Sequence, residues 1–247
     1  MSEPSGREPF TLQVRPGLER ECERAWQRLA SAGTWWSGAE RLAIAAESRL
    51  ARSCALCRAR KAALSPYAAA GDHETHAILP RGVIDVVHRL STDAGRLTRN
   101  WLQRVVGDDL SEEEYVETVG VVAVITALDT FDLSLGKPQR ALPSPLAGEP
   151  ARRRPARARR DLAWVSTVPP EDVAPGDPDP YRVHGTKNIH RALSLVPQEV
   201  FNFFDLDVEL YLKDHEIRDF GRDHRALSHA QIELVAGRVS ALNGCYY

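Results

Sequence analysis

The stretch "SGAERLAIAAESRLARSCALC" spans residues 37–57 and sets the expectation for the whole chain. It opens with Ser37 and Glu40 in a Ser-x-x-Glu capping box, in which each side chain satisfies an orphan amide at a helix start. An Ala-rich run follows, and the stretch closes on a Cys-x-x-Cys at Cys54 and Cys57. The pattern predicts a capped helix, a break, and a thiol pair at the opening of the next helix.

The end of the chain repeats this arrangement in "SHAQIELVAGRVSALNGCYY", residues 228–247, at an offset of 191 positions. Ser228 and Gln231 form the second capping box, and Cys245 follows its capping serine by 17 residues, as Cys54 does. Only four of twenty residues are identical, so the comparison depends on the shared pattern. We interpret it as a tandem duplication. The second copy ends one residue before its expected second thiol, which predicts a fragment or a second unit that has lost its site.

Helical periodicity fills most of the remaining sequence and predicts an all-α fold. "GLERECERAWQRLASAG" (17–33) has apolar residues on one helix face. "EYVETVGVVAVITALDTF" (114–131) predicts a central core helix, although its Val and Ile residues would also suit a strand. We divide the chain into a helical unit at 1–136, a linker at 137–185, and the start of a second, truncated unit at 186–247.

Proline and arginine set the linker apart from both helical units. Ten prolines fall between Lys137 and Pro180, and "ARRRPARARR" (151–160) carries six arginines. Proline blocks helices and removes backbone donors, so this segment is expected to be extended. The arginines predict either a solvated, mobile segment or a surface for phosphate, nucleic acid or an acidic partner.

Bulk composition limits the possible functions. Hydrophobic residues make up 43% and charged residues 27% of the 247 residues, and the net charge is −2. This composition is typical of a soluble globular protein, and the charge makes nucleic acid an unlikely general partner. Apolar runs are too short for a membrane span, and the N-terminus lacks the apolar core of a signal peptide. The sequence therefore predicts a cytoplasmic protein, where a Cys-x-x-Cys is more often catalytic or metal-binding than a structural disulfide.

The segment "IELVAGRVSALNGCYY" (232–247) resembles the active-site helix of the alkyl hydroperoxidase D-like (carboxymuconolactone decarboxylase) superfamily. The motif there is a Glu, about eleven residues ending in Ser-x-x-Asn-x-Cys, and then a continuation as Cys-x-x-Cys-x-x-x-His. Glu233, Ser240, Asn243 and Cys245 match it in register. The remaining Cys and His would fall beyond the last residue of this sequence.

In the first copy, Cys54 and Cys57 match the dithiol of that motif, while Lys61 occupies the His position and Leu42 the Glu position. The resemblance implies an alkyl hydroperoxidase D-like helical bundle that packs as a homo-oligomer. It also implies a thiol-dependent peroxidase without a cofactor, which acts on hydroperoxides and is re-reduced by a thioredoxin- or lipoyl-type thiol.

The chemistry expected of the thiol pair is a dithiol/disulfide cycle. A helix N-terminus and nearby cations favour the thiolate, which is the nucleophile. A peroxide would oxidise one thiolate to a sulfenic acid, and the other Cys would condense with it to a disulfide. Analogy with thioredoxin-like motifs makes Cys54 the attacking residue, whereas the family resemblance implies Cys57, with Cys54 resolving.

The Glu and His that would relay protons in the motif are absent from the first copy. Three other residues are candidates for that role. Glu47 lies in the Ala-rich helix, which we expect to be buried, and a carboxylate there needs a partner or a function. His88, in "IDVVHRL", is the best spare imidazole of the first unit, and Lys61 could supply a positive charge. Each residue also has a non-catalytic interpretation. Glu47 could form an ion pair with an arginine, His88 could be structural, and Lys61 could be solvated.

Two further alternatives stay open. His73 and His76 complete a Cys-x2-Cys-x15-His-x2-His pattern, which approaches the spacing of a zinc finger, although only two residues separate the histidines. We nevertheless expect no metal. The alternative from another functional class is a non-catalytic helical scaffold or partner-binding protein, which the missing Glu and His of the motif favour and the Cys-x-x-Cys opposes.

Overall fold

The computed structural model describes residues 12–107 and 109–245, and within those ranges every regular element is a helix. The prediction of an all-α protein is therefore confirmed for the described chain. The helices are α1 Pro16–Ala30, α2 Gly38–Ala51, α3 Ala55–Ala62, η1 Pro66–Ala68, α4 Arg81–Asp93, η2 Ala94–Arg96, α5 Arg99–Val105, α6 Glu112–Ser134, η3 Pro170–Asp172, α7 Tyr181–His184, α8 Asn188–Arg191, α9 Pro197–Leu210, α10 Asp214–Ile217 and α11 His229–Leu242.

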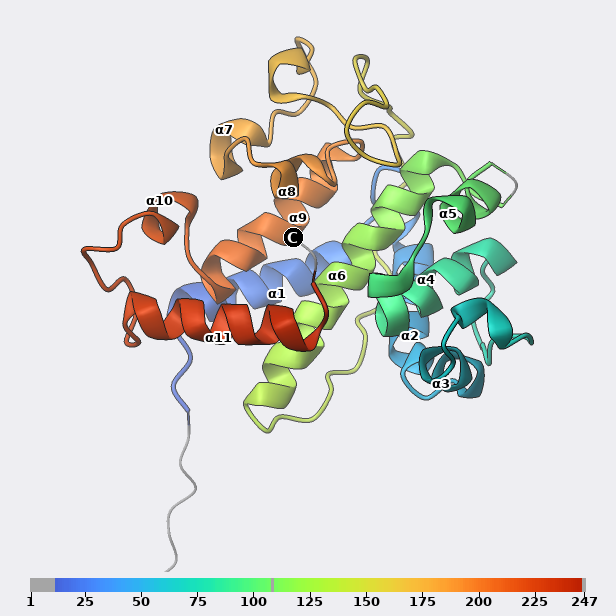
Figure 1. Cartoon of the computed structure of the whole chain (residues 1–247). Helices are drawn as coiled ribbons and strands as arrows, with labels where there is room; N and C mark the ends of the chain where they lie inside the picture. The colour runs from blue at the N-terminus through green and yellow to red at the C-terminus, as the bar shows by residue number, and fades with distance from the viewer. Residues whose placement is uncertain (1–11, 108, 246–247) are drawn as a thin grey trace, which may run out of the picture.

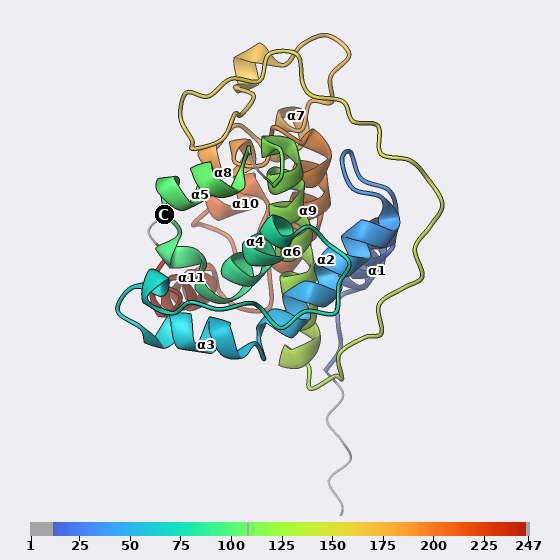
Figure 2. The ribbon, with the colours of Figure 1, turned by 90° about the vertical axis from the view of Figure 1, so that its right-hand side faces the viewer.

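Helix α6 is the centre of the bundle, with α2, α4 and α9 packed against it (Figures 1 and 2). Its apolar residues surround the helix axis, as is typical of a buried helix. Val121, Val124 and Ile125 are almost fully buried. The Val-rich run is thus a helix, not a strand, because tertiary burial outweighs the weak β preference of Val and Ile. None of the described helices is long and apolar enough to cross a membrane.

Both capping boxes described from the sequence are present, and Ser111 with Glu114 forms another at the start of α6. The hydroxyl of Ser37 accepts from the Glu40 amide at the start of α2, and the Glu40 carboxylate accepts from the Ser37 amide in return. The same reciprocal pairs open α6 and α11. Because these bonds join residues three apart, they can be inferred from sequence alone.

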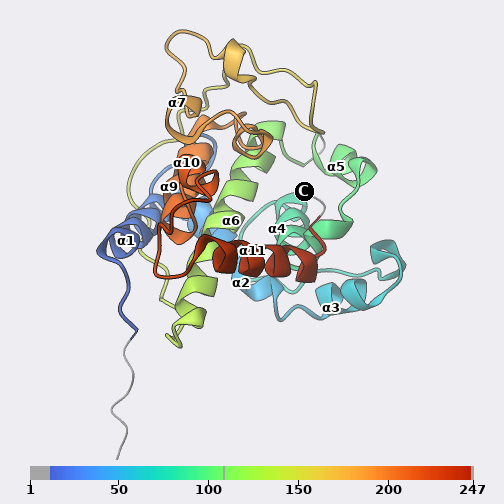
Figure 3. The ribbon, with the colours of Figure 1, turned by 60° about the vertical axis from the view of Figure 1, so that its left-hand side comes forward.

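Helix α9 belongs to the core of the first unit, although it lies within the predicted second unit. Val200 and Phe204 are buried in the same hydrophobic cluster as α1, α2, α4 and α6. By contrast, α11 lies on the outside of the bundle (Figure 3) and exposes Leu234, Val235 and Leu242. The interior of the bundle is thus completed by the segment after the linker, while the duplication itself stays a prediction.

A fully buried charge network ties α9 to α2 and α6. Arg41 Nη1 donates to Glu117 Oε1 at 2.6 Å and to Glu199 Oε1 at 2.7 Å, and these side chains are at most 1% exposed. Gly120 allows the approach of α9, because a Cβ at that position would lie 2.4 Å from Glu199 Oε2. Burial raises the pKa of Glu117, and Arg41 opposes that rise.

The Pro/Arg-rich linker runs along the outside of the bundle (Figure 2). It is anchored by the Leu146 amide, which donates to the Ala30 carbonyl at 2.8 Å. Arg154 pairs with Glu113, and Arg160 pairs with Glu112, in the acidic first turn of α6. These arginines therefore bind carboxylates of the same chain, at the helix end where the macrodipole also favours negative charge.

We expect Arg41→Ala to lower the free energy of unfolding by about 3–5 kcal/mol, because it leaves two buried carboxylates without their shared partner. Urea unfolding followed by circular dichroism measures the change. The control is Arg20→Ala on an exposed position of α1, for which a change within about 0.5 kcal/mol is expected. Equal losses in the two variants would contradict a structural role for the network.

Candidate functional site

The break between α2 and α3 places the two cysteines at the start of α3. Cys54 is the N-cap residue of α3, with an extended backbone, and Cys57 lies one turn further on. Cys54 makes no side-chain capping hydrogen bond, although the nearby backbone amide of Cys57 favours the ionised form of its sulfur. Both residues are buried, Cys54 at 0% and Cys57 at 3% exposure.

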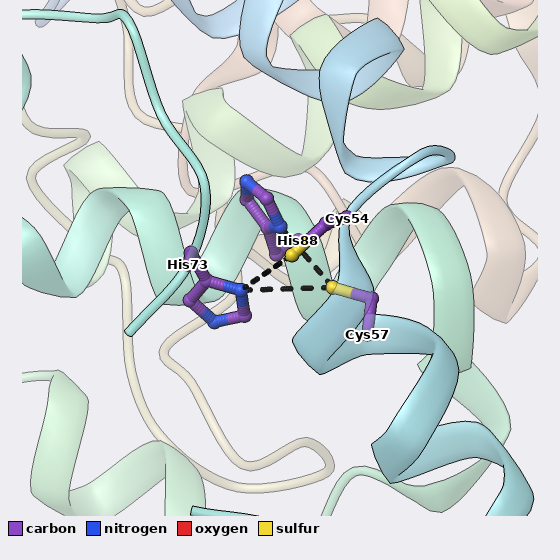
Figure 4. Close-up of side chains that lie close together, drawn as sticks. All are labelled: Cys54, Cys57, His73 and His88. Atoms are coloured by element: carbon purple, nitrogen blue, oxygen red, sulfur yellow. Dashed lines mark hydrogen bonds between the residues drawn. The ribbon is translucent and has the colours of Figure 1, made fainter. Parts of the chain in front are cut away.

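Two histidines face this thiol pair (Figure 4). His88 comes from the buried face of α4, and its Nδ1 lies 3.1 Å from Cys57 Sγ. His73 comes from the irregular segment between η1 and α4. Its Nδ1 lies 3.6 Å from Cys57 Sγ and 3.7 Å from Cys54 Sγ. The four ligand atoms all lie within 4.8 Å of one another, so the cluster could hold a single metal ion.

Each histidine has a carboxylate on its far side. His88 Nε2 donates to Glu47 Oε1 at 2.7 Å, and both of these side chains are at most 2% exposed. The second oxygen of Glu47 accepts from the Thr75 hydroxyl at 3.0 Å. His73 Nε2 donates to Asp85 Oδ1 at 2.9 Å. Because Nε2 carries the proton in both rings, Nδ1 of each ring is directed at the sulfurs.

Asp85 is the anchor of the His73 side of the site. Besides His73, it accepts from Arg60 Nη1 at 2.7 Å and from Trp101 Nε1 at 2.8 Å. Burial opposes ionisation of this carboxyl, but these donors hold the pKa of Asp85 well below its ordinary value of 3.8. It is therefore a carboxylate at neutral pH and holds the ring of His73 in place.

The two histidines differ in their tendency to take up a proton. Burial lowers the pKa of His88, because Glu47 only partly compensates for the loss of water. Burial also acts against protonation of His73, but its bonds to Asp85 and the cysteines raise the pKa of His73 to about 10. Burial opposes ionisation of Cys54, yet the Cys57 amide and the His73 ring lower the pKa of Cys54 to about 7. The site thus favours an imidazolium–thiolate pair beside a neutral imidazole.

Two clefts border the carboxylates of the site. A polar cleft of about 470 Å³ is lined by Arg60, His73 and Asp85, among others. A more apolar cleft of about 490 Å³ is lined by Glu47 together with residues of α2 and of the segment before α4. Each histidine–carboxylate pair therefore ends at a cleft, while the sulfurs themselves are buried.

The structure brings together four of the five catalytic candidates predicted for the first unit: Cys54, Cys57, Glu47 and His88. It places Lys61 on the exposed side of α3. The cation that contacts the site is the preceding residue, Arg60, at 3.1 Å from His73 Nε2 and 2.7 Å from Asp85.

The Cys-x2-Cys-x15-His-x2-His pattern includes only one of the two histidines that the structure places beside the thiols. His73 lies there, but His76 is exposed and His88 takes the other position. Asp85 was not recognised from sequence. The sequence feature that points to Asp85 is its position three residues before His88, which puts both side chains on one face of α4.

The predicted remnant of a second site lies apart from this cluster, on and beyond α11. Glu233 accepts from the Tyr211 hydroxyl and lies 3.5 Å from His229 Nε2. Cys245 is exposed just after α11, where its amide donates to the Ser240 carbonyl at 2.9 Å.

No family model, curated protein or solved structure matches this chain. The resemblance to the alkyl hydroperoxidase D-like superfamily therefore depends on the quoted motifs alone.

Asp85→Asn is expected to lower the free energy of unfolding at pH 7 by roughly 3 kcal/mol, because three buried or half-buried donors lose a charged acceptor. The folded-state pKa of Asp85 is depressed, so its contribution is complete above its ordinary value of 3.8 and is lost as the pH falls through the folded value. The difference between the native chain and the variant should therefore narrow between pH 5 and pH 2.

Denaturant unfolding at a series of pH values measures this difference. Asp72→Asn is the matched control, because Asp72 lines the same cleft but its side chain is 79% exposed. A difference in the free energy of unfolding that stays constant down to pH 2 would show that the carboxylate charge of Asp85 does not stabilise the fold.

Proposed function

We propose that the chain is a thiol-dependent oxidoreductase that reduces hydroperoxides through a dithiol/disulfide cycle at Cys54 and Cys57. The supporting observation is the convergence of two histidine–carboxylate pairs on the two sulfurs. His88 with Glu47 meets Cys57, and His73 with its own carboxylate meets both cysteines. One general acid and one general base, each oriented by a carboxylate, is the arrangement that such a cycle requires.

In the first step, the Cys54 thiolate attacks the terminal oxygen of the hydroperoxide. The O–O bond breaks, Cys54 becomes a sulfenic acid, and the leaving alkoxide takes the proton of the protonated His73 ring. Asp85 holds that ring in position and stabilises its positive charge before the transfer.

In the second step, the Cys57 thiol gives its proton to His88, whose Nδ1 lies 3.1 Å from the sulfur. The resulting thiolate attacks Cys54 and displaces hydroxide, which takes the proton back from His88 and leaves as water. Glu47 stabilises the transient imidazolium. A dithiol reductant then returns two electrons and two protons to the disulfide by thiol–disulfide exchange.

The order of attack proposed here differs from the order that the family resemblance implies. Cys54 is the N-cap residue, so its sulfur lies at the positive end of α3, where the Cys57 amide favours the thiolate. Cys57 lies against the neutral base His88. These contacts favour Cys54 as the attacking thiolate and Cys57 as the resolving residue.

The burial of the sulfurs favours a second candidate, a non-catalytic helical scaffold. With Cys54 at 0% and Cys57 at 3% exposure, a hydroperoxide reaches the thiols only after the segment bearing His73 moves. Without such movement the thiols are inert and the cluster serves only to hold the fold together.

For the reduced chain, a thiol titration should fall from four thiols to two after treatment with hydrogen peroxide or an organic hydroperoxide. The loss should disappear in Cys54→Ser, because no attacking thiolate remains. Cys22→Ser is the control. Cys22 is buried in α1 with its pKa raised by burial to about 11, so its removal should still leave a loss of two thiols. Four unreactive thiols in the native chain would favour the scaffold.

The order of attack can be tested with a sulfenic-acid trap. We expect a stable adduct at Cys54 in Cys57→Ser, because the resolving thiol is absent. In His88→Gln, we expect disulfide formation to slow by about 100-fold, the lower range for loss of a general base. Mass spectrometry and stopped-flow thiol assays measure the two effects. An adduct that forms only at Cys57, in Cys54→Ser, would reverse the order.

A further inference from the structure

The two thiols and the two histidines beside them also form a complete donor set for one metal ion. We infer that Cys54, Cys57, His73 and His88 bind a zinc ion in tetrahedral geometry (Figure 4). This inference depends on the arrangement of donor atoms and not on the proposed redox activity.

The distances between donor atoms fit a tetrahedral site. Zinc–sulfur bonds of about 2.3 Å and zinc–nitrogen bonds of about 2.0–2.1 Å place a sulfur and a nitrogen about 3.5 Å apart. The observed separations are 3.1 Å between Cys57 and His88, 3.6 Å between Cys57 and His73, and 3.7 Å between Cys54 and His73. The remaining pairs of donor atoms lie within 4.8 Å of one another.

The orientation of both imidazole rings is that of metal ligands. Each ring directs Nδ1 at the shared centre and bonds through Nε2 to a carboxylate, Asp85 for His73 and Glu47 for His88. A carboxylate behind a ligating histidine fixes the tautomer and makes the ring a stronger donor. Finding it on both histidines of one cluster is the second, independent observation in favour of a metal.

The identity of the metal follows from the donors and the charge. Two thiolates neutralise a divalent ion, so a loaded site needs no further counter-charge within the buried cluster. Magnesium and calcium prefer oxygen ligands, whereas tetrahedral sulfur and nitrogen donors favour zinc. With four protein ligands and both sulfurs buried, the site has the closed form of a structural zinc centre.

Zinc binding would also control the proposed thiol chemistry, and this consequence rests on the proposed function. The ion occupies both thiolates, so the loaded form should react with peroxide more slowly than the metal-free form. Oxidation of both sulfurs by a hydroperoxide with uptake of two protons yields the disulfide, an alcohol, water and the released zinc ion. Zinc occupancy and the disulfide therefore exclude each other.

The test uses the full chain, reduced and stripped of metal by a chelator, then titrated with zinc or cobalt(II) chloride. We expect one zinc per chain by elemental analysis. The cobalt form should show the thiolate charge-transfer band and the intense visible bands of a tetrahedral site, which zinc then abolishes. The native chain alone thus gives a result if a variant fails to fold. No bound zinc and no tetrahedral cobalt spectrum would overturn the inference.

Variants identify the ligands. His73→Asn and His88→Asn should each lose the zinc at equimolar metal, while His76→Asn, an exposed neighbour on the same segment, should retain it. Asp85→Asn should weaken zinc binding by about 10- to 100-fold, since it leaves all four ligands in place but frees one ring. Zinc loss in His76→Asn with retention in His88→Asn would overturn the assignment.

The outcomes separate the two proposals. Stoichiometric zinc, with metal-free thiols that ignore peroxide, supports the metal centre and contradicts the redox function. Loss of two thiols to peroxide in a chain that never binds zinc supports the redox function and contradicts the metal centre. Two thiols that peroxide oxidises quickly in the metal-free chain, and more slowly and with release of the ion in the zinc-loaded chain, support both.

Discussion

The hydrogen bond between His88 and Glu47 is the constraint on which the site depends. It joins α4 to α2 inside the bundle, where at most 2% of either side chain is exposed. Water cannot solvate these groups there, so each must keep the other as its partner. The bond therefore fixes the ring, and with the ring fixed, Nδ1 has to face Cys57 at the start of α3. The packing of α4 against α2 thus determines the orientation of the His88 imidazole.

The requirement that buried charges keep a partner also applies to a second network in the bundle. Arg41 satisfies carboxylates from α6 and α9 at once, so the segment after the linker is bound to the bundle by charge as well as by apolar contact. Two arginines of the linker, Arg154 and Arg160, pair with the acidic first turn of α6. The Arg41 network and the His88–Glu47 pair both join helices far apart in sequence, and each fixes the relative position of the helices that it joins.

The two chemistries proposed for the thiol pair need the same arrangement of side chains around the sulfurs. A peroxide-reducing dithiol needs a stabilised thiolate and an oriented imidazole, and a zinc ion needs thiolates and an imidazole lone pair. The carboxylates behind His73 and His88 supply both needs. The two chemistries differ in the access they need. The burial of Cys54 and Cys57 suits a closed metal site, whereas peroxide chemistry requires a route from solvent to the sulfurs.

By itself, the sequence determined the helices, their capping boxes and the place of the Cys-x-x-Cys at a helix start, because these depend on contacts three or four residues apart. It also selected Glu47 and His88 as candidates, but it could not pair them, since 41 residues separate them. Only the tertiary structure decided that His88 and not His76 meets the thiols, and that Asp85 stands behind His73. The physical reason is that local spacing fixes which face of a helix a side chain occupies, whereas the direction in which helices pack decides which faces meet.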